Sequence, residues 1–132
     1  MKSGSSIFEE QTIHPRELEI LKSTTLSSHI TPSIINSYNN LIKIDAQSSE
    51  IKILKGLGQF INHFEIIILE VSLHKYNKDA PLFDEVMNFM NDKDFCLYDI
   101  YDLKRLGNNN SFLLQFDCIF IRKNSNLLKV KF

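Results

Sequence analysis

Acidic side chains lie at or near the carboxyl ends of two apolar runs of this 132-residue chain, in positions where they could act on a hydroxyl group. Asp45 stands directly after the run at residues 41–44, and Glu70 lies near the carboxyl end of the run at residues 64–71. If the two runs form neighbouring parallel strands, both carboxylates lie at the edge of the sheet where open α/β proteins bind ligands. A carboxylate in that place can take the proton of a bound hydroxyl or accept a hydrogen bond from it. We therefore take Asp45 as the first catalytic candidate.

Glu50 is the second catalytic candidate, and both acids also have a structural interpretation. Residues 46–49 form a short polar connection, and residues 50–55 form a predicted helix that Gly56 ends in the left-handed conformation. Asp45 could cap that helix by accepting a hydrogen bond from a free backbone N–H. Glu50 could lie in the first turn only for its favourable effect on the helix dipole. The sequence leaves both interpretations open.

Lys43 is a charged residue inside a predicted buried strand, where an unpaired charge costs free energy. Side chains two residues apart in a strand share a face, so Asp45 lies within its reach, and Glu70 is the other predicted partner. A structural ion pair is favoured here over a catalytic lysine. The substrate-binding candidates are Lys43, Gln47, Glu70, Ser72 and His74.

The remaining substrate-binding candidates follow the ends of the two runs. Gln47 could orient a substrate or serve only to solvate the turn. Ser72 lies at the end of the second run, and His74, in the loop that follows, is a candidate general base. The four histidines are isolated in the sequence, so no metal-binding pattern is found. No serine lies in a G-x-S-x-G segment, which leaves a hydrolase without support.

The elements that must position these residues predict one α/β domain. Strands are expected at residues 41–45, 64–71, 95–101 and 115–122, and helices at residues 50–55 and 81–91. The continuous apolar run at residues 64–71 indicates a central parallel strand that is buried on both faces. The loop around residues 107–110 has no room for a crossover helix, so the last two strands are expected to be antiparallel. The predicted sheet is mostly parallel, with an antiparallel last strand.

Residues 1–40 are predicted to be a lead that precedes the main α/β unit at residues 41–132. Within the lead, residues 17–21 alternate charged and apolar side chains, which predicts a half-buried strand in a β excursion over the sheet. We place no chemistry on this lead.

The composition argues against several classes of partner. The net charge is −1 and the lysines are spread along the chain, so no nucleic-acid partner is expected. The adjacent cations Lys104 and Arg105 are interpreted as part of a solvated loop. No apolar run approaches the length of a membrane span and no signal-peptide core follows Met1, so no membrane association is expected. Cys96 and Cys118 lack C-x-x-C spacing and are predicted to be buried reduced thiols of a cytoplasmic protein.

The stretch at residues 43–56 resembles the signature of the FkbM-type methyltransferases, K-I-D-[VA]-[EQ]-G-x-E-x-x-[VI]-L-[KR]-G. The matching residues are Lys43, Ile44, Asp45, Ala46, Gln47, Glu50, Leu54, Lys55 and Gly56. Ser48 stands at the position of the family's glycine, which matters if that glycine allows a positive φ or the close approach of a ligand. The resemblance extends over most of the chain, and includes the later segments L-E-V-S-L, A-P-L-F, L-Y-D-I and Q-x-D-x-x-F-x-R.

The resemblance implies an S-adenosylmethionine-dependent methyltransferase that methylates a hydroxyl on a sugar, a polyketide or a related small molecule. It also implies a partial class I, Rossmann-like sheet, since such enzymes hold the cofactor on an earlier strand, glycine-rich loop and helix. The four glycines are Gly4, Gly56, Gly58 and Gly107, and none lies in such a unit. We therefore expect the carboxyl-terminal half of the fold without the N-terminal cofactor-binding half. No residue is assigned to the cofactor, which the chain alone is expected to bind poorly.

Two hypotheses about function remain open. In the first, the chain is the substrate side of the enzyme, binds a small-molecule acceptor, and becomes active when the missing half is supplied from upstream or by another chain. In the second, it is a truncated, non-catalytic remnant that serves as a binding or homo-oligomeric assembly module. The second follows from residues 41–45, which would present an unpaired strand edge.

Overall fold

The computed structural model describes residues 6–9, 11, 13, 15, 17–31, 33 and 40–129. The strands and α-helices within these residues are β1 (Asn40–Ile44), α2 (Glu50–Leu57), β2 (Phe64–Ser72), α3 (Phe83–Asp92), β3 (Phe95–Leu106) and β4 (Phe112–Arg122). Short 3-10 helices are η1 (Leu26–His29), η2 (Gly58–His63), η3 (Asn108–Asn110) and η4 (Asn126–Leu128). No helix among the described residues is long and apolar enough to cross a membrane.

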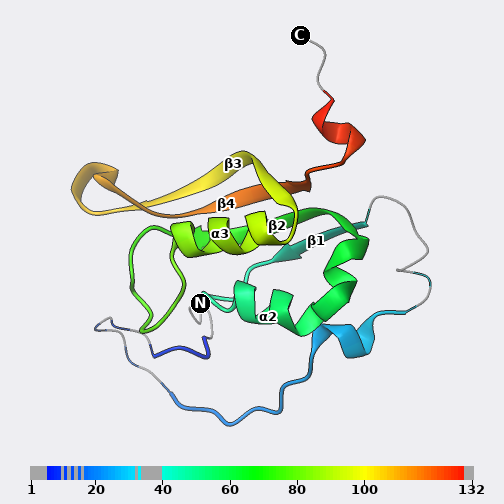
Figure 1. Cartoon of the computed structure of the whole chain (residues 1–132). Coiled ribbons are helices and arrows are strands. Elements are labelled where there is room, and N and C mark those ends of the chain that lie inside the picture. Colours follow the sequence, from blue (N-terminus) through cyan, green and yellow to red (C-terminus); the bar gives the residue numbers. More distant parts are fainter. Residues whose placement is uncertain are drawn as a thin grey trace.

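The strands form one mixed sheet in the order β1-β2-β4-β3 (Figure 1). β1 and β2 are parallel, whereas β4 is antiparallel to both of its neighbours, β2 and β3. β1, β2 and β3 therefore run in one direction, and β4 alone is reversed. The predictions of a central parallel strand at residues 64–71 and of an antiparallel last pair of strands are confirmed, and the parallel strand beside β2 is β1.

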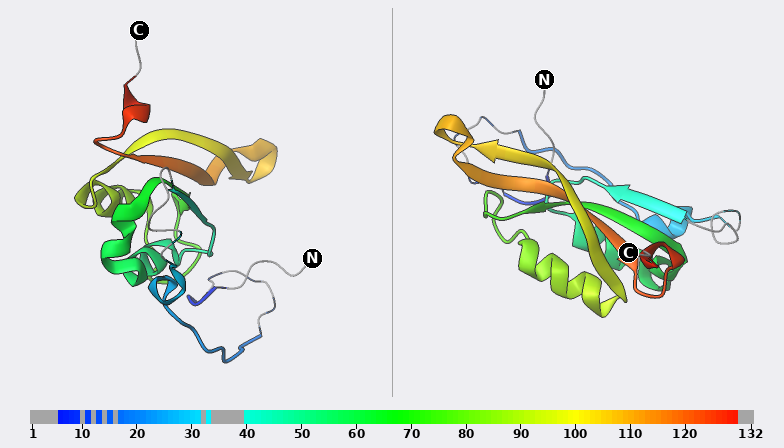
Figure 2. Two further views of the ribbon diagram at one scale, coloured as in Figure 1. Left: turned by 90° about the vertical axis from the view of Figure 1, so that its right-hand side faces the viewer. Right: turned by 90° about the horizontal axis from the view of Figure 1, so that it is seen from above.

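The two faces of the sheet differ in composition. α2 and α3 lie against the same face (Figures 1 and 2), and they bury Leu54, Leu57, Val86 and Met90 against it. The strand residues on that face are Ile67, Leu69, Val71, Phe116, Cys118 and Phe120, all of them buried. The opposite face carries polar and charged side chains and has no described α-helix over it. We call it the helix-free face, and Glu70, Gln115 and Asp117 lie on it.

Residues 17–21 do not form the predicted strand, and no regular secondary structure is found up to residue 25. Leu18 and Ile20 are fully exposed, at 104% and 101% of their reference areas. An alternating sequence forms a strand only when a neighbouring strand supplies hydrogen bonds and a core covers its apolar side. No described residue does either for this segment, so the predicted strand is wrong here. Other parts of the lead at residues 1–40 lie outside the described residues.

α2 ends two residues later than the sequence predicts. Gly56 lies inside the helix, and the C-cap is Gly58, with φ 56° and ψ −130°. Glycine adopts that conformation readily, whereas residues with a Cβ are strained in it. The prediction that Gly56 ends the helix is wrong because Leu57 is fully buried. Burying its side chain gains about 2 kcal/mol, which exceeds the cost of about 1 kcal/mol for one glycine in a helix.

Gly56→Ala and Gly58→Ala are expected to change stability in opposite directions. A Cβ at Gly56 would lie in ordinary contact with Thr25, 3.7 Å from its Cβ, and alanine gains about 1 kcal/mol over glycine inside a helix. At Gly58, alanine would be held at a positive φ, at a cost of about 1–3 kcal/mol. Urea unfolding should place Gly56→Ala above the natural protein and Gly58→Ala below it. The opposite order would show that the helix ends at Gly56.

Candidate functional site

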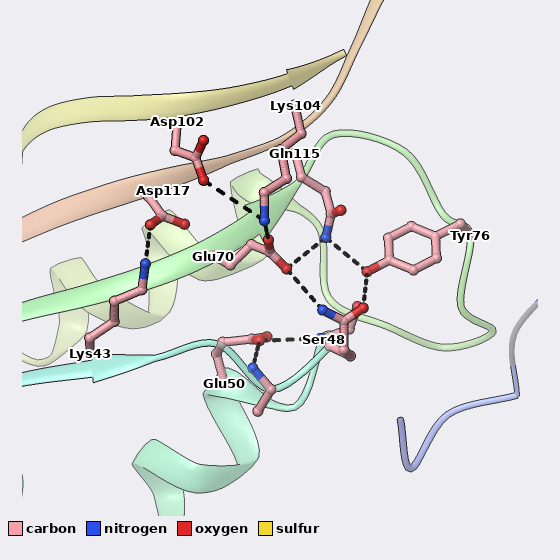
Figure 3. Close-up of polar contacts among 11 residues, drawn as sticks. Lys43, Ser48, Glu50, Glu70, Tyr76, Asp102, Lys104, Gln115 and Asp117 are labelled. Carbon is pink, nitrogen blue, oxygen red and sulfur yellow. Dashed lines mark hydrogen bonds and ion pairs between the residues drawn. The ribbon is translucent and has the colours of Figure 1, made fainter. Parts of the chain in front are cut away.

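Two carboxylates lie next to each other on the helix-free face, near the carboxyl end of β2 (Figure 3). Glu70 of β2 is paired with Asp117 of β4 in the strand register, and the two residues are only 3% and 1% exposed. Like charges directly opposite each other destabilise a sheet, so each carboxylate needs a cation. Lys43 of β1 reaches past β2 to Asp117, and Lys104 of β3 reaches past β4 to Glu70. The two ion pairs therefore link the outer strands to the inner ones.

Lys43 makes the structural ion pair that is expected of it, but with a different partner. The bond to Asp117 raises the pKa of Lys43, and the ammonium also lies 5.7 Å from the centre of the Tyr101 ring. The prediction of Asp45 or Glu70 as the partner is wrong. Asp45 lies just past the end of β1, where strand alternation no longer sets the direction of a side chain.

Glu70 accepts hydrogen bonds from three side chains. Its Oε1 accepts from Lys104 Nζ, and its Oε2 accepts from Gln115 Nε2 at 2.9 Å and from Gln47 Nε2 at 3.4 Å. A carboxylate that is bonded to three donors and buried has little capacity left for a substrate hydroxyl. The geometry therefore favours a role for Glu70 in organising the site.

The connection between β1 and α2 is a tight turn with two consecutive residues at positive φ. Gln47 has φ 48° and Ser48 has φ 76°. Glu50, the buried first residue of α2, folds back and accepts from the backbone N–H of Ala46 at 2.9 Å and of Ser48 at 3.2 Å. Burial raises the pKa of Glu50, and the two N–H bonds oppose that shift. Because its carboxylate closes the turn from inside, the geometry favours a structural role for Glu50.

The loop after β2 fastens the same turn from the other side. Buried Asn77 donates from Nδ2 to the backbone oxygen of Gln47 at 3.4 Å and to Ser48 Oγ at 3.3 Å. The Tyr76 hydroxyl accepts from Gln115 Nε2 at 2.8 Å and donates to Gln47 Oε1 at 3.5 Å (Figure 3). Burial raises the pKa of Tyr76, so the hydroxyl stays protonated and can make that donation at neutral pH. The turn is thus held by both its own helix and the next loop.

Asp45 is the acid of this region that stays unengaged. It is exposed and makes no hydrogen bond or ion pair with the other described residues of the chain. The N-cap of α2 is Ser49, so the interpretation of Asp45 as the helix cap is wrong. The charge of Asp45 nevertheless reaches Lys104. The bond to Glu70 is the main cause that raises the pKa of Lys104, and the charges of Asp45 and Asp102 raise it further.

Ser72 and His74 lie in different surroundings. Ser72 is the buried last residue of β2 and is paired with Gln115, beside the hydrogen bonds of Glu70. His74 is exposed, and its ring packs edge-on against Phe112 with 5.1 Å between the ring centres. The structure therefore places four of the candidates, Asp45, Gln47, Glu70 and Ser72, at one end of the sheet. Lys43 lies on β1, two residues before Asp45, and His74 lies outside the group.

Several residues of the site are not among the candidates from the sequence: Tyr76, Asn77, Lys104, Gln115 and Asp117. Gln115 and Asp117 alternate within an apolar strand, and that pattern could have marked a polar strip on one face. Tyr76 and Asn77 lie in a loop where nothing local distinguishes them. The interpretation of Lys104 as part of a solvated loop is wrong, because β3 extends to Leu106 and the ammonium bonds a buried carboxylate.

The described residues do not fit a nucleotide cofactor. In the turn between β1 and α2, the N–H groups of Ala46 and Ser48 are bonded to Glu50, so a ligand cannot use them. The loop between β2 and α3 contains no glycine that would allow the close approach of a ligand to the backbone. Nor do the described residues contain a group of three His, Cys, Asp or Glu side chains that could hold a metal ion.

Comparison with known proteins bears on the family of this chain. A family model described as the Methyltransferase FkbM domain matches residues 2–97, which include β1, α2, β2 and α3. Searches among curated proteins and among solved structures found no match. Lys104, Gln115 and Asp117 lie beyond the matched residues.

Ser48→Gly is expected to be more stable than Ser48→Ala. Ser48 stands where the resembling signature has glycine, and its φ of 76° lies in the region that favours glycine. Both substitutions remove the contact with Asn77 Nδ2, but only alanine keeps a Cβ that is strained at positive φ. We expect a difference of about 1 kcal/mol in the free energy of unfolding by urea. Equal stabilities would show that the turn relaxes out of this conformation.

Glu50→Gln is expected to change how stability depends on pH. An acid whose pKa is raised by burial binds its proton more tightly in the folded state, so the natural protein loses stability as the pH rises from the unfolded pKa through the folded one. Glutamine cannot titrate but its oxygen can still accept from Ala46 and Ser48. The free energy of unfolding of the natural protein, minus that of Glu50→Gln, should therefore fall as the pH rises through the interval above about 4.3, the ordinary pKa of a glutamic acid.

The control for this experiment is Asp92→Asn, which removes one negative charge from an exposed position at the end of α3. Its difference profile should stay close to flat over the same interval. If the free energy of unfolding of the natural protein, minus that of Glu50→Gln, rises with pH, the structural role of the buried carboxylate is contradicted.

Proposed function

Because this chain belongs to the FkbM methyltransferase domain family, we propose that it forms the acceptor-binding side of an S-adenosylmethionine-dependent methyltransferase. The proposed reaction is O-methylation of a hydroxyl on a sugar or another small molecule. In this proposal, the sheet is the carboxyl-terminal portion of a class I, Rossmann-like sheet, and β4 is its reversed strand.

The observation that carries the proposal is that Asp45 is exposed and has no bond to another described residue. Three other carboxylates at this end of the sheet are bonded, since Glu50 closes the turn, Glu70 accepts from three donors and Asp117 pairs with Lys43. Asp45 is exposed at the carboxyl end of β1, where open α/β sheets bind their ligands, and it has no bond to another described residue. It is therefore able to meet an acceptor molecule.

The chemistry asked of Asp45 is modest. An oxygen that gains a methyl group must lose its proton, and a carboxylate within hydrogen-bond reach can accept that proton. Alignment of the acceptor supplies the rest, because a well-oriented group reacts far faster than a freely diffusing one. Gln47, held by Tyr76 and bonded to Glu70, stands two residues from Asp45 and is the amide best placed to orient the acceptor.

The cofactor is assigned to a different unit. Since the described residues do not fit it, we propose that a separate strand, glycine-rich loop and helix holds S-adenosylmethionine. Such a unit could lie on other residues of the protein or on another chain.

Asp45→Asn should weaken acceptor binding at the β1–α2 turn. We expect methyl glycosides and simple alcohols, titrated into the isotope-labelled protein, to move the backbone amide resonances of residues 45–48. Loss of a hydrogen bond to a charged group such as the Asp45 carboxylate costs about 1.5–3 kcal/mol. The variant should therefore bind the hydroxyl compound at least about tenfold more weakly. Asp92→Asn, at an exposed site on α3, should bind as the natural protein does. Resonance changes confined to other regions, or unchanged binding in Asp45→Asn, would refute the proposed role.

An alternative function, as an assembly module, is favoured by the edge of the sheet. β1 is an edge strand in the described sheet, and Leu41 on it is 54% exposed. An open strand edge is a template for pairing with another chain. Analytical ultracentrifugation separates the two functions: the module predicts oligomers that Leu41→Lys disperses and no response to any hydroxyl compound, whereas the acceptor site predicts the resonance changes described above.

A further inference from the structure

β3 contains a bulge beside the site. From Tyr101 to Lys104 the strand advances three residues, while its partners on β4, Asp117 and Gln115, are two residues apart. One extra residue is therefore inserted in β3, and Asp102 within it has φ 49°. A non-glycine residue at that φ costs about 1–3 kcal/mol. Bulges that re-aim a side chain are common next to functional sites.

The bulge decides the direction in which Lys104 points. In a regular strand, residues 101 and 103 would share a face and residue 104 would point to the helix-covered face. With the extra residue, Lys104 shares the helix-free face with Tyr101 and reaches Glu70, as Figure 3 shows for Lys104 and Glu70. The bulge thus places a cation on the same face as the carboxylates of the site.

The ammonium of Lys104 keeps donors available. Its side chain is 42% exposed, and it donates a hydrogen bond to Glu70 Oε1. Asp102 is 3.9 Å away, which is an ion-pair distance but too long for a hydrogen bond. An ammonium has three N–H donors, so the described residues leave the other two N–H groups to a ligand or water. Ile44 pairs with Leu69 in the strand register, so the next residue, Asp45, lies at the level of Glu70, the carboxylate that Lys104 contacts. The charge of Asp45 also raises the pKa of Lys104, in agreement with that register.

We propose that Lys104 is a positioning residue of the acceptor site, brought there by the β3 bulge, and that its ammonium faces Asp45 across the place where the acceptor hydroxyl binds. This rests on the proposed function. The acid accepts the hydroxyl proton, while the ammonium donates to a lone pair of the same oxygen or of a neighbouring one. The arrangement suits an acceptor with adjacent oxygen atoms. Lys104 lies outside residues 2–97, so the family match does not include it.

The first test measures whether Lys104 faces Asp45 and needs no acceptor. Nuclear magnetic resonance of the Lys104 Cε during alkaline titration reports the ammonium directly. Asp45→Asn should shift the titration midpoint of Lys104 downward, because one of the charges that raise its pKa is removed. Asp92→Asn should leave it unchanged. Equal midpoints in the natural protein and in Asp45→Asn would show that the ammonium does not face Asp45, and would overturn the proposal.

The second test moves the cation while keeping the composition. The double substitution Leu103→Lys with Lys104→Leu places the lysine one residue earlier, where the bulge no longer aims it at Glu70. We expect the backbone amide resonances of Asp45 and Gln47 to shift in this variant. In the separate variant Lys104→Arg, which keeps a cation, we expect the same resonances to stay at their natural positions. Unshifted resonances in the exchanged variant would overturn the proposal even if it folds normally. Neither test uses an acceptor molecule. The results of both tests are therefore independent of whether the methyl glycosides and alcohols bind.

Discussion

The constraint on which the rest of the structure depends is the pair of carboxylates on the two inner strands of the sheet. Glu70 and Asp117 are register partners on β2 and β4, and both are buried. Side by side and ionised, they would destabilise the sheet. The fold places one lysine from each outer strand against them, Lys43 from β1 and Lys104 from β3. The order β1-β2-β4-β3 is what puts both cations within reach, since each reaches across one inner strand.

The same arrangement organises the end of the sheet. Glu70, neutralised by its lysine, has a second oxygen that accepts from Gln115 and Gln47, and Tyr76 joins those two amides. The β1–α2 turn is thereby connected to two strands and to the loop after β2. Ser48 can keep a positive φ in this turn because Glu50 and the loop residue Asn77 hold it there, whereas a glycine would need no such support. Glu50, Glu70 and Asp117 are each bonded in this arrangement, whereas Asp45 is exposed and has no bond to another described residue.

Patterns with strong local causes predicted structure well. The apolar run at residues 64–71 became the central strand β2, and the helix at residues 81–91 became α3 with Val86 and Met90 buried. Patterns that depend on a distant partner failed. The alternating residues 17–21 have nothing described to pair with, and Gly56 stayed in its helix because Leu57 could be buried. Local propensity amounts to about 1 kcal/mol per residue, so one buried side chain or one absent partner reverses it.

The sequence by itself determined the family signature, the α/β class and the position of Asp45 at a strand end. Each of these follows from neighbours along the chain, through hydrophobic period or short spacing. Only the tertiary structure decided which acid is unengaged and which lysine pairs with which carboxylate. Lys43 and Asp117 are separated by 74 residues, and Lys104 and Glu70 by 34. Ion pairs form between charges that the folded sheet brings within about 4 Å, and no spacing along the chain encodes that distance.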